Sequence, residues 1–192
     1  IARGDHLAAI QDRGLLYKTP DQSMHLPIPA VSHPREIKFH GDEVVILTMK
    51  TQHTEAALED LRLAAGDEIP LFCCQNGVAN ERMALRRFQN VHAMMVYLPA
   101  ILLDPGSVLA HAARKSGVLD ASIYPTGSND LVDEVTGTLD GVNFSARPNP
   151  TVMRFKYGKL IMNLGNALAA VSPPGDEADA IRTQMRAEAE AC

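Results

Sequence analysis

The feature that most constrains the fold is an alternation of apolar runs and amphipathic segments between residues 42 and 103. The runs in "DEVVILTMK", "EIPLFCCQNG" and "VHAMMVYLPAILL" resemble strands that are buried on both faces, as in parallel sheets. Between them, residues 54–66 and 79–88 carry apolar residues at helical spacing. Strand, helix, strand, helix, strand with short links predicts an α/β fold with a doubly wound sheet.

The segments around this alternation are shorter and less regular. Asp5 is a plausible N-cap and Gly14 a C-terminal stop for a first helix, and the Pro-rich stretch 17–39 predicts short strands and turns. After Gly106 we expect short strands in "SVLAHAA" and "ASIYPTG", a helix around "NDLVDEVTGTLDG" and a strand in "FSARPNP". Everything from Thr151 onward is expected to be helical.

The sequence Pro148-Asn149-Pro150 is the best candidate for a domain boundary, because proline interrupts both helices and strands. We therefore predict an incomplete α/β domain over residues 1–147 and, in residues 148–192, the start of a helical domain for substrate binding or dimerisation. The chain begins without Met, as though a strand had just ended, and it stops within a helical pattern. We expect it to be a truncated piece of a longer protein.

Composition narrows the classes of partner. The net charge is −5 and the basic residues are scattered, which argues against a nucleic acid or an acidic membrane as the main partner. No apolar run reaches the length of a membrane span, so a cytoplasmic location is the expectation. The adjacent Cys73 and Cys74 point to opposite faces of a strand and are expected to be core residues of a reducing compartment.

Two of the predicted strands end in polar residues. Lys50 ends the first run, and Asn76 with Gly77 ends the second. In open α/β sheets ligands bind beyond the carboxyl ends of the strands, and a glycine there allows the backbone to approach a ligand closely. The alternative is that Lys50 is a solvated strand end and that "QNG" is an ordinary turn.

The helical segment "KYGKLIMNLGNAL" carries Lys159, Asn163 and Asn166 on one side, because they are four and seven residues apart. This side is either the solvated face of an amphipathic helix or the wall of a pocket. The segment alone does not decide between them.

Arg3 is a further candidate, since it would follow a strand that Ile1 and Ala2 finish. Dinucleotide-binding folds read the adenosine ribose at this place, and an arginine there suits the 2′-phosphate of NADP. The glycine-rich turn of such a fold would lie upstream of this chain. An ordinary surface arginine is the alternative. The seven histidines show no ligand spacing, so no metal is expected.

Four pieces in order, "ARGDHL", "TMKTQHTEAAL", "QNGVANE" and "KYGKLIMNLGNAL", resemble the ketopantoate reductase (2-dehydropantoate 2-reductase) family along nearly the whole chain. The resemblance implies a Rossmann-like domain followed by an all-helical domain, with the active site between them. It implies NADPH-dependent reduction of a small-molecule 2-oxo acid, most simply ketopantoate to pantoate in pantothenate synthesis. A homodimer through the helical domain is compatible with it.

The resemblance also assigns roles to particular residues. Lys159 matches the catalytic lysine that protonates the ketone oxygen, and Asn163 matches a substrate-binding asparagine. Asn76 matches an asparagine near nicotinamide and substrate, Lys50 a lysine of the cofactor cleft, and Arg3 the arginine that selects NADP. The chain departs from the family in three ways: it lacks the glycine-rich turn, it has no assignable substrate-gripping carboxylate, and it carries His53 and Ala167 where the family commonly has polar amides.

Two other hypotheses stay open at this stage. The chain could be a non-catalytic binding module of this fold, since it lacks the phosphate-cradling turn, and we expect the chain by itself to be inactive. It could also come from a sister 2-oxoacid or hydroxyacid dehydrogenase, which would carry much the same residues.

Overall fold

The central element of the computed structural model, which describes residues 1–102, 104–112 and 114–192, is a four-stranded sheet. Its strand order is β3-β4-β5-β8. The strands span Val45–Leu47 (β3), Leu71–Cys73 (β4), Val91–Met94 (β5) and Ala121–Ile123 (β8). The first three strands are parallel, as predicted, and β8 pairs antiparallel with β5. We call this sheet and the helices packed on it the body.

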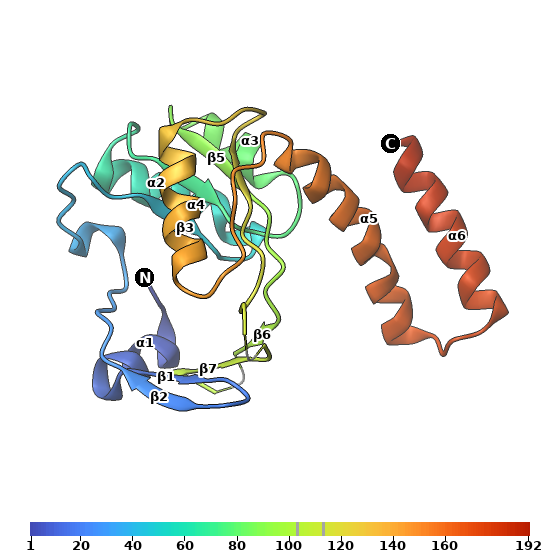
Figure 1. The fold of residues 1–192 in the computed structure, drawn as a ribbon, viewed down its shortest axis with the longest axis horizontal. Coiled ribbons are helices and arrows are strands. Elements are labelled where there is room, and N and C mark those ends of the chain that lie inside the picture. The colour runs from blue at the N-terminus through green and yellow to red at the C-terminus, as the bar shows by residue number, and fades with distance from the viewer. Residues whose placement is uncertain (103, 113) are drawn as a thin grey trace.

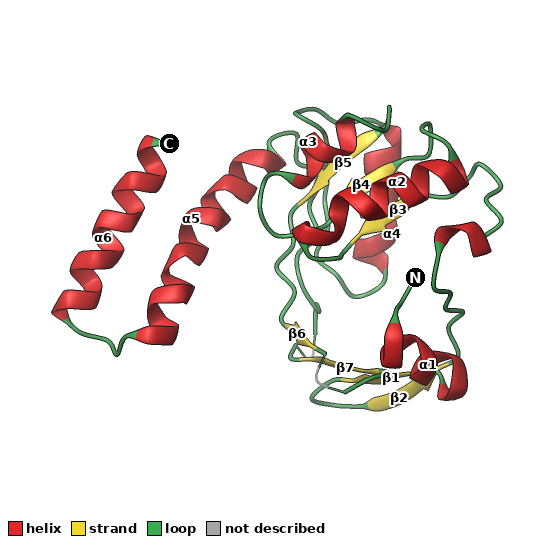
Figure 2. Cartoon of the chain, turned by 180° about the vertical axis from the view of Figure 1, so that it is seen from behind, coloured by secondary structure: helices red, strands yellow, loops and turns green. Residues whose placement is uncertain are grey.

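Helices cover both faces of this sheet, which confirms the doubly wound α/β prediction (Figures 1 and 2). On one face α2 (Thr54–Ala65) and α3 (Asn80–Leu85) pack around Leu58, Leu71 and Phe88. On the other face α4 (Asp130–Gly141) packs through Val132 against Phe72 and the strands beside it. Cys73 belongs to the first cluster and Cys74 packs against the second, so the two cysteines do point to opposite faces.

The strand β3 differs from its prediction. It lies at the edge of the sheet, and Ile46 is 39% exposed, so the strand is not buried on both faces. A run of apolar residues predicts an interior strand only when a neighbour covers each edge. A 3-10 helix η2 (Thr51–His53) follows β3 and leads into α2.

A second four-stranded sheet, which the sequence did not predict, has the order β2-β1-β7-β6. Its strands are Leu15–Lys18 (β1), Ser23–Leu26 (β2), Ala100–Ile101 (β6) and Ser107–Ala110 (β7). The helix α1 (Gly4–Arg13) packs on it through Ala9 and Ile10. Gly14 ends α1 as predicted, but the N-cap is Arg3, so the assignment of Asp5 as N-cap was wrong. Asp5 lies in the first turn, where a carboxylate favours the helix dipole.

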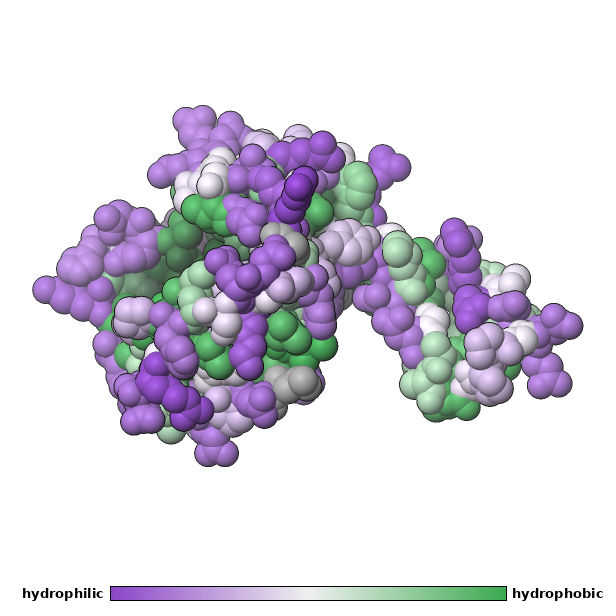
Figure 3. Space-filling model, turned by 60° about the horizontal axis from the view of Figure 1, so that its bottom comes forward, coloured by the Kyte–Doolittle hydropathy of each residue, from purple (hydrophilic) through white to green (hydrophobic). Residues whose placement is uncertain are grey.

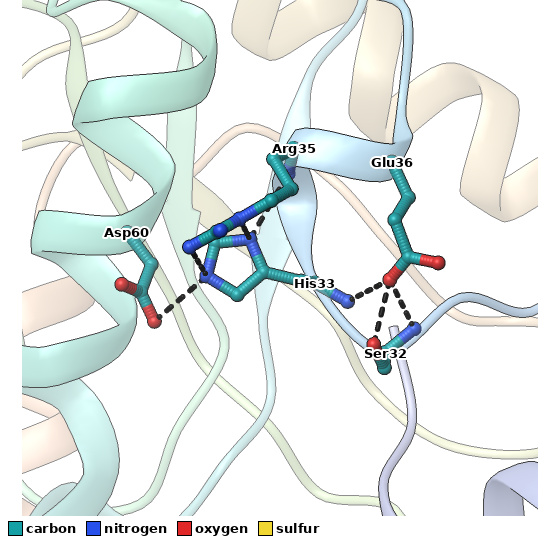
Figure 4. Close-up of polar contacts among 5 residues, drawn as sticks. All are labelled: Ser32, His33, Arg35, Glu36 and Asp60. Atoms are coloured by element: carbon teal, nitrogen blue, oxygen red, sulfur yellow. Dashed lines mark hydrogen bonds and ion pairs between the residues drawn. The ribbon is translucent and has the colours of Figure 1, made fainter.

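A short linker helix η1 (Pro34–Glu36) attaches the chain leaving this second sheet to the body (Figure 4). The Glu36 carboxylate accepts hydrogen bonds from the backbone N–H groups of Ser32 and His33, at 3.0 and 2.8 Å. The His33 ring lies 3.4 Å from the Asp60 carboxylate of α2. The Glu36 hydrogen bonds hold the turn of the linker itself, and the His33–Asp60 contact joins the linker to α2.

The last two helices form an arm that projects from the body (Figures 1 and 2). α5 spans Val152–Val171 and α6 spans Asp176–Ala191, as the helical pattern predicted. The strand predicted in 144–150 is absent; Ser145 and Pro148 make isolated bridges to Val118 and Ala121 instead. Within the described residues, no helix combines the length and the hydrophobicity that crossing a membrane requires.

Candidate functional site

An open pocket lies where the carboxyl ends of β4 and β5 meet the first half of α5. It is the place where open α/β sheets bind ligands. Three chain segments form its wall: the loop after β4, the end of β5 and one face of α5. The lining residues are Gln75, Asn76, Gly77, Met95, Val96, Lys156, Lys159, Leu160 and Asn163.

The loop after β4 is held by a network of side-chain amides. The Gln75 amide nitrogen donates to the Met49 carbonyl (3.0 Å) and to the Thr54 hydroxyl (2.8 Å), and that hydroxyl donates to the Asn80 side-chain oxygen (2.9 Å). Asn80 in turn donates to the Asn76 carbonyl at 3.3 Å. The backbone therefore presents the exposed Asn76 side chain at a fixed place on the pocket rim.

Gly77 follows Asn76 with φ of 86°, a conformation that L side chains rarely adopt. The predicted tight turn after β4 is therefore present, and glycine is the residue that it requires.

The start of α5 is fixed by the Pro-Asn-Pro segment before it. The Asn149 side-chain oxygen accepts hydrogen bonds from the backbone N–H and the hydroxyl of Thr151, both at 3.1 Å. One residue further on, Val152 is buried against Ala93 and Met95 at the end of β5. These contacts direct the first turns of the helix along the pocket.

Lys159 is half-buried in the pocket wall. Its ammonium group donates to the Val96 carbonyl and lies 4.6 Å from the centre of the Tyr97 ring, a cation–π geometry. Burial, and secondarily the neighbouring charge of Lys156, lowers the pKa of Lys159 below its ordinary value. No carboxylate among the described residues forms an ion pair with it. Such an ammonium is a good proton donor at neutral pH.

Lys156, one turn before Lys159, is a site residue that the sequence did not single out. Its side chain is buried and pairs with the fully buried Glu81 carboxylate at 2.5 Å, and it also donates to the Cys73 carbonyl at 3.1 Å. Two signals were available: Glu81 ends the "QNGVANE" segment, and Lys156 lies three residues before Lys159. Neither signal shows that a charged residue will be buried.

Of the five residues predicted for the site, the structure brings Lys159, Asn163 and Asn76 to one pocket. Lys50 is exposed at the N-cap of η2 after β3, and Arg3 is exposed at the N-cap of α1; neither lines this pocket.

Asn166, the third polar residue predicted on this side of α5, does not line the pocket as Lys159 and Asn163 do. Asn166 is exposed and outside the pocket, although it shares a face with Lys159. The twenty residues of α5 make a helix about 30 Å long, and its second half projects away from the body (Figure 1).

One polar atom of the pocket wall has no partner among the described residues. The Gln75 side-chain oxygen is buried and accepts no hydrogen bond. Buried acceptors are normally satisfied, so this atom is suited to an N–H or O–H donor of a ligand.

A doubly wound sheet with polar groups converging beyond its carboxyl edge defines the class of Rossmann-like α/β proteins that bind ligands at that edge. Comparison with known proteins then identifies the family. The profile of the ketopantoate reductase PanE/ApbA family matches residues 1–121, and the chain belongs to this family. The resemblance found in the sequence is thereby confirmed.

Two named proteins illustrate the relationship. The 2-dehydropantoate 2-reductase of Pyrococcus horikoshii is 27% identical over 175 residues, which cover 91% of this chain and 54% of that protein. The crystal structure of a PanE/ApbA family ketopantoate reductase from Ralstonia eutropha JMP134 superposes with a TM-score of 0.84 at 22% identity, covering all of this chain and 64% of that one. The chain spans about half the length of the curated relatives that it matches.

A third solved structure is D-mandelate dehydrogenase with NADH and anilino(oxo)acetate. It has a TM-score of 0.69 at 18% identity and covers 83% of this chain and 50% of that one. Agreement at this level of identity concerns the fold, which these structures share with the chain.

Proposed function

We propose that this chain carries part of the active site of an NADPH-dependent 2-oxo acid reductase, with 2-dehydropantoate as the substrate and Lys159 as the general acid. The observation that supports it is the convergence of the Lys159 ammonium and the asparagines 76 and 163 on one pocket. We choose 2-dehydropantoate as the substrate because the matching family and the relative from Pyrococcus horikoshii are named for its reduction.

The residues at the carboxyl edge fit a nicotinamide cofactor. The unpartnered oxygen of Gln75 is an acceptor suited to the N–H groups of a carboxamide, and Asn76 stands beside it on the rim. Lys50, at the N-cap of η2, and Arg3, at the N-cap of α1, are exposed cations that would hold the phosphates. Arg3 would select the 2′-phosphate of NADP. Such a cofactor supplies the hydride when it is bound.

Lys159 supplies the proton. Reduction of a ketone places negative charge on the carbonyl oxygen, and an ammonium group both stabilises that charge and donates the proton that yields the alcohol. The lysine becomes a neutral amine and regains a proton from water before the next turnover. Its lowered pKa makes this transfer less costly than it would be from an exposed lysine.

The asparagines orient the substrate. Asn163 lies one turn after Lys159 on the same face of α5, so its amide can bind the substrate next to the reacting carbonyl. Asn76 faces the same space from the sheet. Binding from two separate elements fixes the orientation of a small 2-oxo acid, which lowers the entropic cost of reaching the transition state.

The test is NADPH oxidation with 2-dehydropantoate by the full-length product of the gene that encodes this chain. We expect Lys159→Met to lower kcat by roughly 10²–10⁴-fold, the usual contribution of a general acid. Lys115→Met is the matched control, since Lys115 forms an exposed ion pair with Asp140 away from the pocket. Equal turnover by the Lys159→Met variant would exclude lysine as the proton donor.

A second candidate, a sister 2-oxo acid reductase, is favoured by the fold similarity to D-mandelate dehydrogenase. The same assay with aromatic 2-oxo acids and with NADH in place of NADPH distinguishes it. A preference for NADH and an aromatic substrate, with the same loss in the Lys159→Met variant, would support this candidate over ketopantoate reduction.

A further inference from the structure

The buried ion pair between Lys156 and Glu81 joins the two parts of the molecule that form the site. Lys156 belongs to α5, the first helix of the arm, and Glu81 belongs to α3 in the body, four residues after Gly77. The Lys156 ammonium contacts the Glu81 carboxylate at 2.5 Å and the Cys73 carbonyl, at the end of β4, at 3.1 Å. One side chain of α5 is thus fixed to both elements that flank the Asn76 loop.

The pair is a costly way to hold a helix. Both side chains are almost fully removed from water, and the second oxygen of Glu81 has no hydrogen-bond partner among the described residues. The desolvation of two such charges often exceeds their attraction, so apolar residues of similar size commonly stabilise a protein as well or better. General stability is therefore a poor explanation for the pair, and its position suggests a better one.

The apolar contacts between α5 and the body are few. They centre on Val152 and Met153, which pack with Ala93 and Met95 in a small cluster at the start of the helix. Lys156 is the next contact along the helix, and Lys159 follows one turn later with its bond to the Val96 carbonyl. Further along, the Tyr97 hydroxyl lies 3.9 Å from the Met162 sulfur, which is a weak acceptor. The direction in which α5 leaves the body therefore depends mainly on the polar contacts of residues 156–159.

We propose that the Lys156–Glu81 pair is the positioning element of the candidate site, which holds α5 across the end of β4 so that the Lys159 ammonium faces Asn76. The role of Lys159 as the group to be positioned rests on the proposed function. The positioning itself does not, because it concerns where α5 lies, whether or not hydride transfer occurs.

Positioning and direct electrostatic action on Lys159 lead to different results. The charged or titratable groups that face Lys159 are Lys156 on its own helix, Cys74 after β4 and the Tyr97 ring after β5. If α5 stayed in place without the pair, the only change would be in the local field around Lys159. If the pair positions α5, the backbone of the helix must also loosen when the pair is removed.

Backbone amide hydrogen exchange on the intact chain tests this directly. Three variants remove the pair in different ways: Glu81→Gln, Lys156→Met, and the double variant with both changes. The double variant leaves no unpaired buried charge, so the proposal can still be tested with it if a single variant fails to fold. Lys115→Met, which breaks the exposed pair with Asp140, is the matched control.

We expect exchange in residues 153–163 to rise at least tenfold in every variant that folds, while exchange in β4 and β5 of the same molecules changes by less than threefold. The rate at which an amine-reactive acylating reagent modifies Lys159, measured by mass spectrometry, should increase in the same variants. The control should change neither. Unchanged protection of α5, or an equal loss in α5 and the strands, would overturn the proposal, since the first excludes positioning and the second shows a merely structural role. A lack of reductase activity would refute the proposed function alone.

Discussion

The body and the arm of this molecule are held in different ways. In the body, apolar side chains from three helices cover both faces of the sheet, and residues such as Leu58, Phe72 and Val132 are completely buried. The arm leaves several large apolar side chains exposed along α5 and α6 (Figure 3). They are Phe155, Tyr157, Leu160, Met162, Val171 and Ile181.

This difference indicates that the body provides most of the stability, whereas the arm contributes side chains to the site. The body holds the core, so we expect it to set the free energy of unfolding, and its sheet presents the Asn76 loop from a rigid edge. The arm reaches that edge through the apolar side chains of Val152 and Met153 and through the polar contacts of Lys156 and Lys159. We call these contacts between α5 and the body the junction. A site that is assembled across the junction depends more on a few directional contacts than on the burial of apolar surface.

The largest expected effect on stability is from truncation of a core residue in the body. Leu58→Ala removes a completely buried side chain beneath β3 and β4 and should lower the free energy of unfolding by about 2–5 kcal/mol. Met162→Ala on the arm, where the side chain is 68% exposed, should change it by no more than about 0.5 kcal/mol. Chemical denaturation monitored by far-UV circular dichroism measures both. Equal losses would show that the arm belongs to the same cooperative core.

A smaller effect is expected at Gly117, which packs closely against the backbone of Tyr97 and Leu98. A Cβ there would lie 2.3 Å from the Tyr97 carbonyl oxygen and 3.0 Å from the Leu98 Cα, and these are backbone atoms that must shift. Gly117→Ala should therefore cost about 1–3 kcal/mol, as overpacking does, and move the Tyr97 ring away from Lys159.

Gly137 in α4 supplies the comparison for this substitution, since nothing lies within 4 Å of a Cβ built there. Gly137→Ala should stabilise the protein by up to about 1 kcal/mol through the reduced entropy of the unfolded chain. Thermal unfolding of the two variants decides the point. A Gly117→Ala variant as stable as the wild type would mean that the close approach to Tyr97 is relieved without cost.

The smallest expected effect is the pH dependence that Lys159 adds to stability. Burial and Lys156 lower its pKa in the folded chain, so at pH values between that pKa and the ordinary value near 10.5 the unfolded chain binds more protons. Stability should therefore rise with pH across this window in the wild type relative to Lys159→Met. The rise is small because the group is partly solvated. Urea unfolding of both proteins at several pH values measures the difference between their free energies of unfolding. If the wild type lost stability relative to Lys159→Met as the pH rose, the lowered pKa would be contradicted.

The order of elements in the body was largely predictable from sequence because each element carries its own signal. Apolar runs, helical spacing and glycine stops placed β3, α2, β4, α3 and β5 correctly. The edge position of β3 and the second sheet could not be predicted in this way, since they depend on which strands pair across long separations of sequence. The pairing of β1 with β7, for example, joins Leu16 to Ser107.

The candidate site was predictable only in part. The helical spacing of Lys159 and Asn163 placed them on one face, but the same spacing included Asn166, which the structure leaves exposed. Periodicity specifies a face and does not specify how far along a helix the contact with the body extends. The positions of Lys156 and Glu81 next to the recognised segments did not reveal that the two side chains are buried together, because buried charged residues are rare and the two residues lie 75 positions apart.

The most direct test of the central claim is to follow the side-chain amide signals of Asn76, Asn163 and Asn166 by NMR while 2-dehydropantoate is titrated in the presence of NADP⁺, which has no hydride to transfer and therefore leaves the substrate unreduced. We expect the signals of Asn76 and Asn163 to shift together with one dissociation constant, and that of Asn166 to stay unchanged. Shifts confined to one of the first two, or equal shifts at Asn166, would show that sheet and helix do not share a ligand.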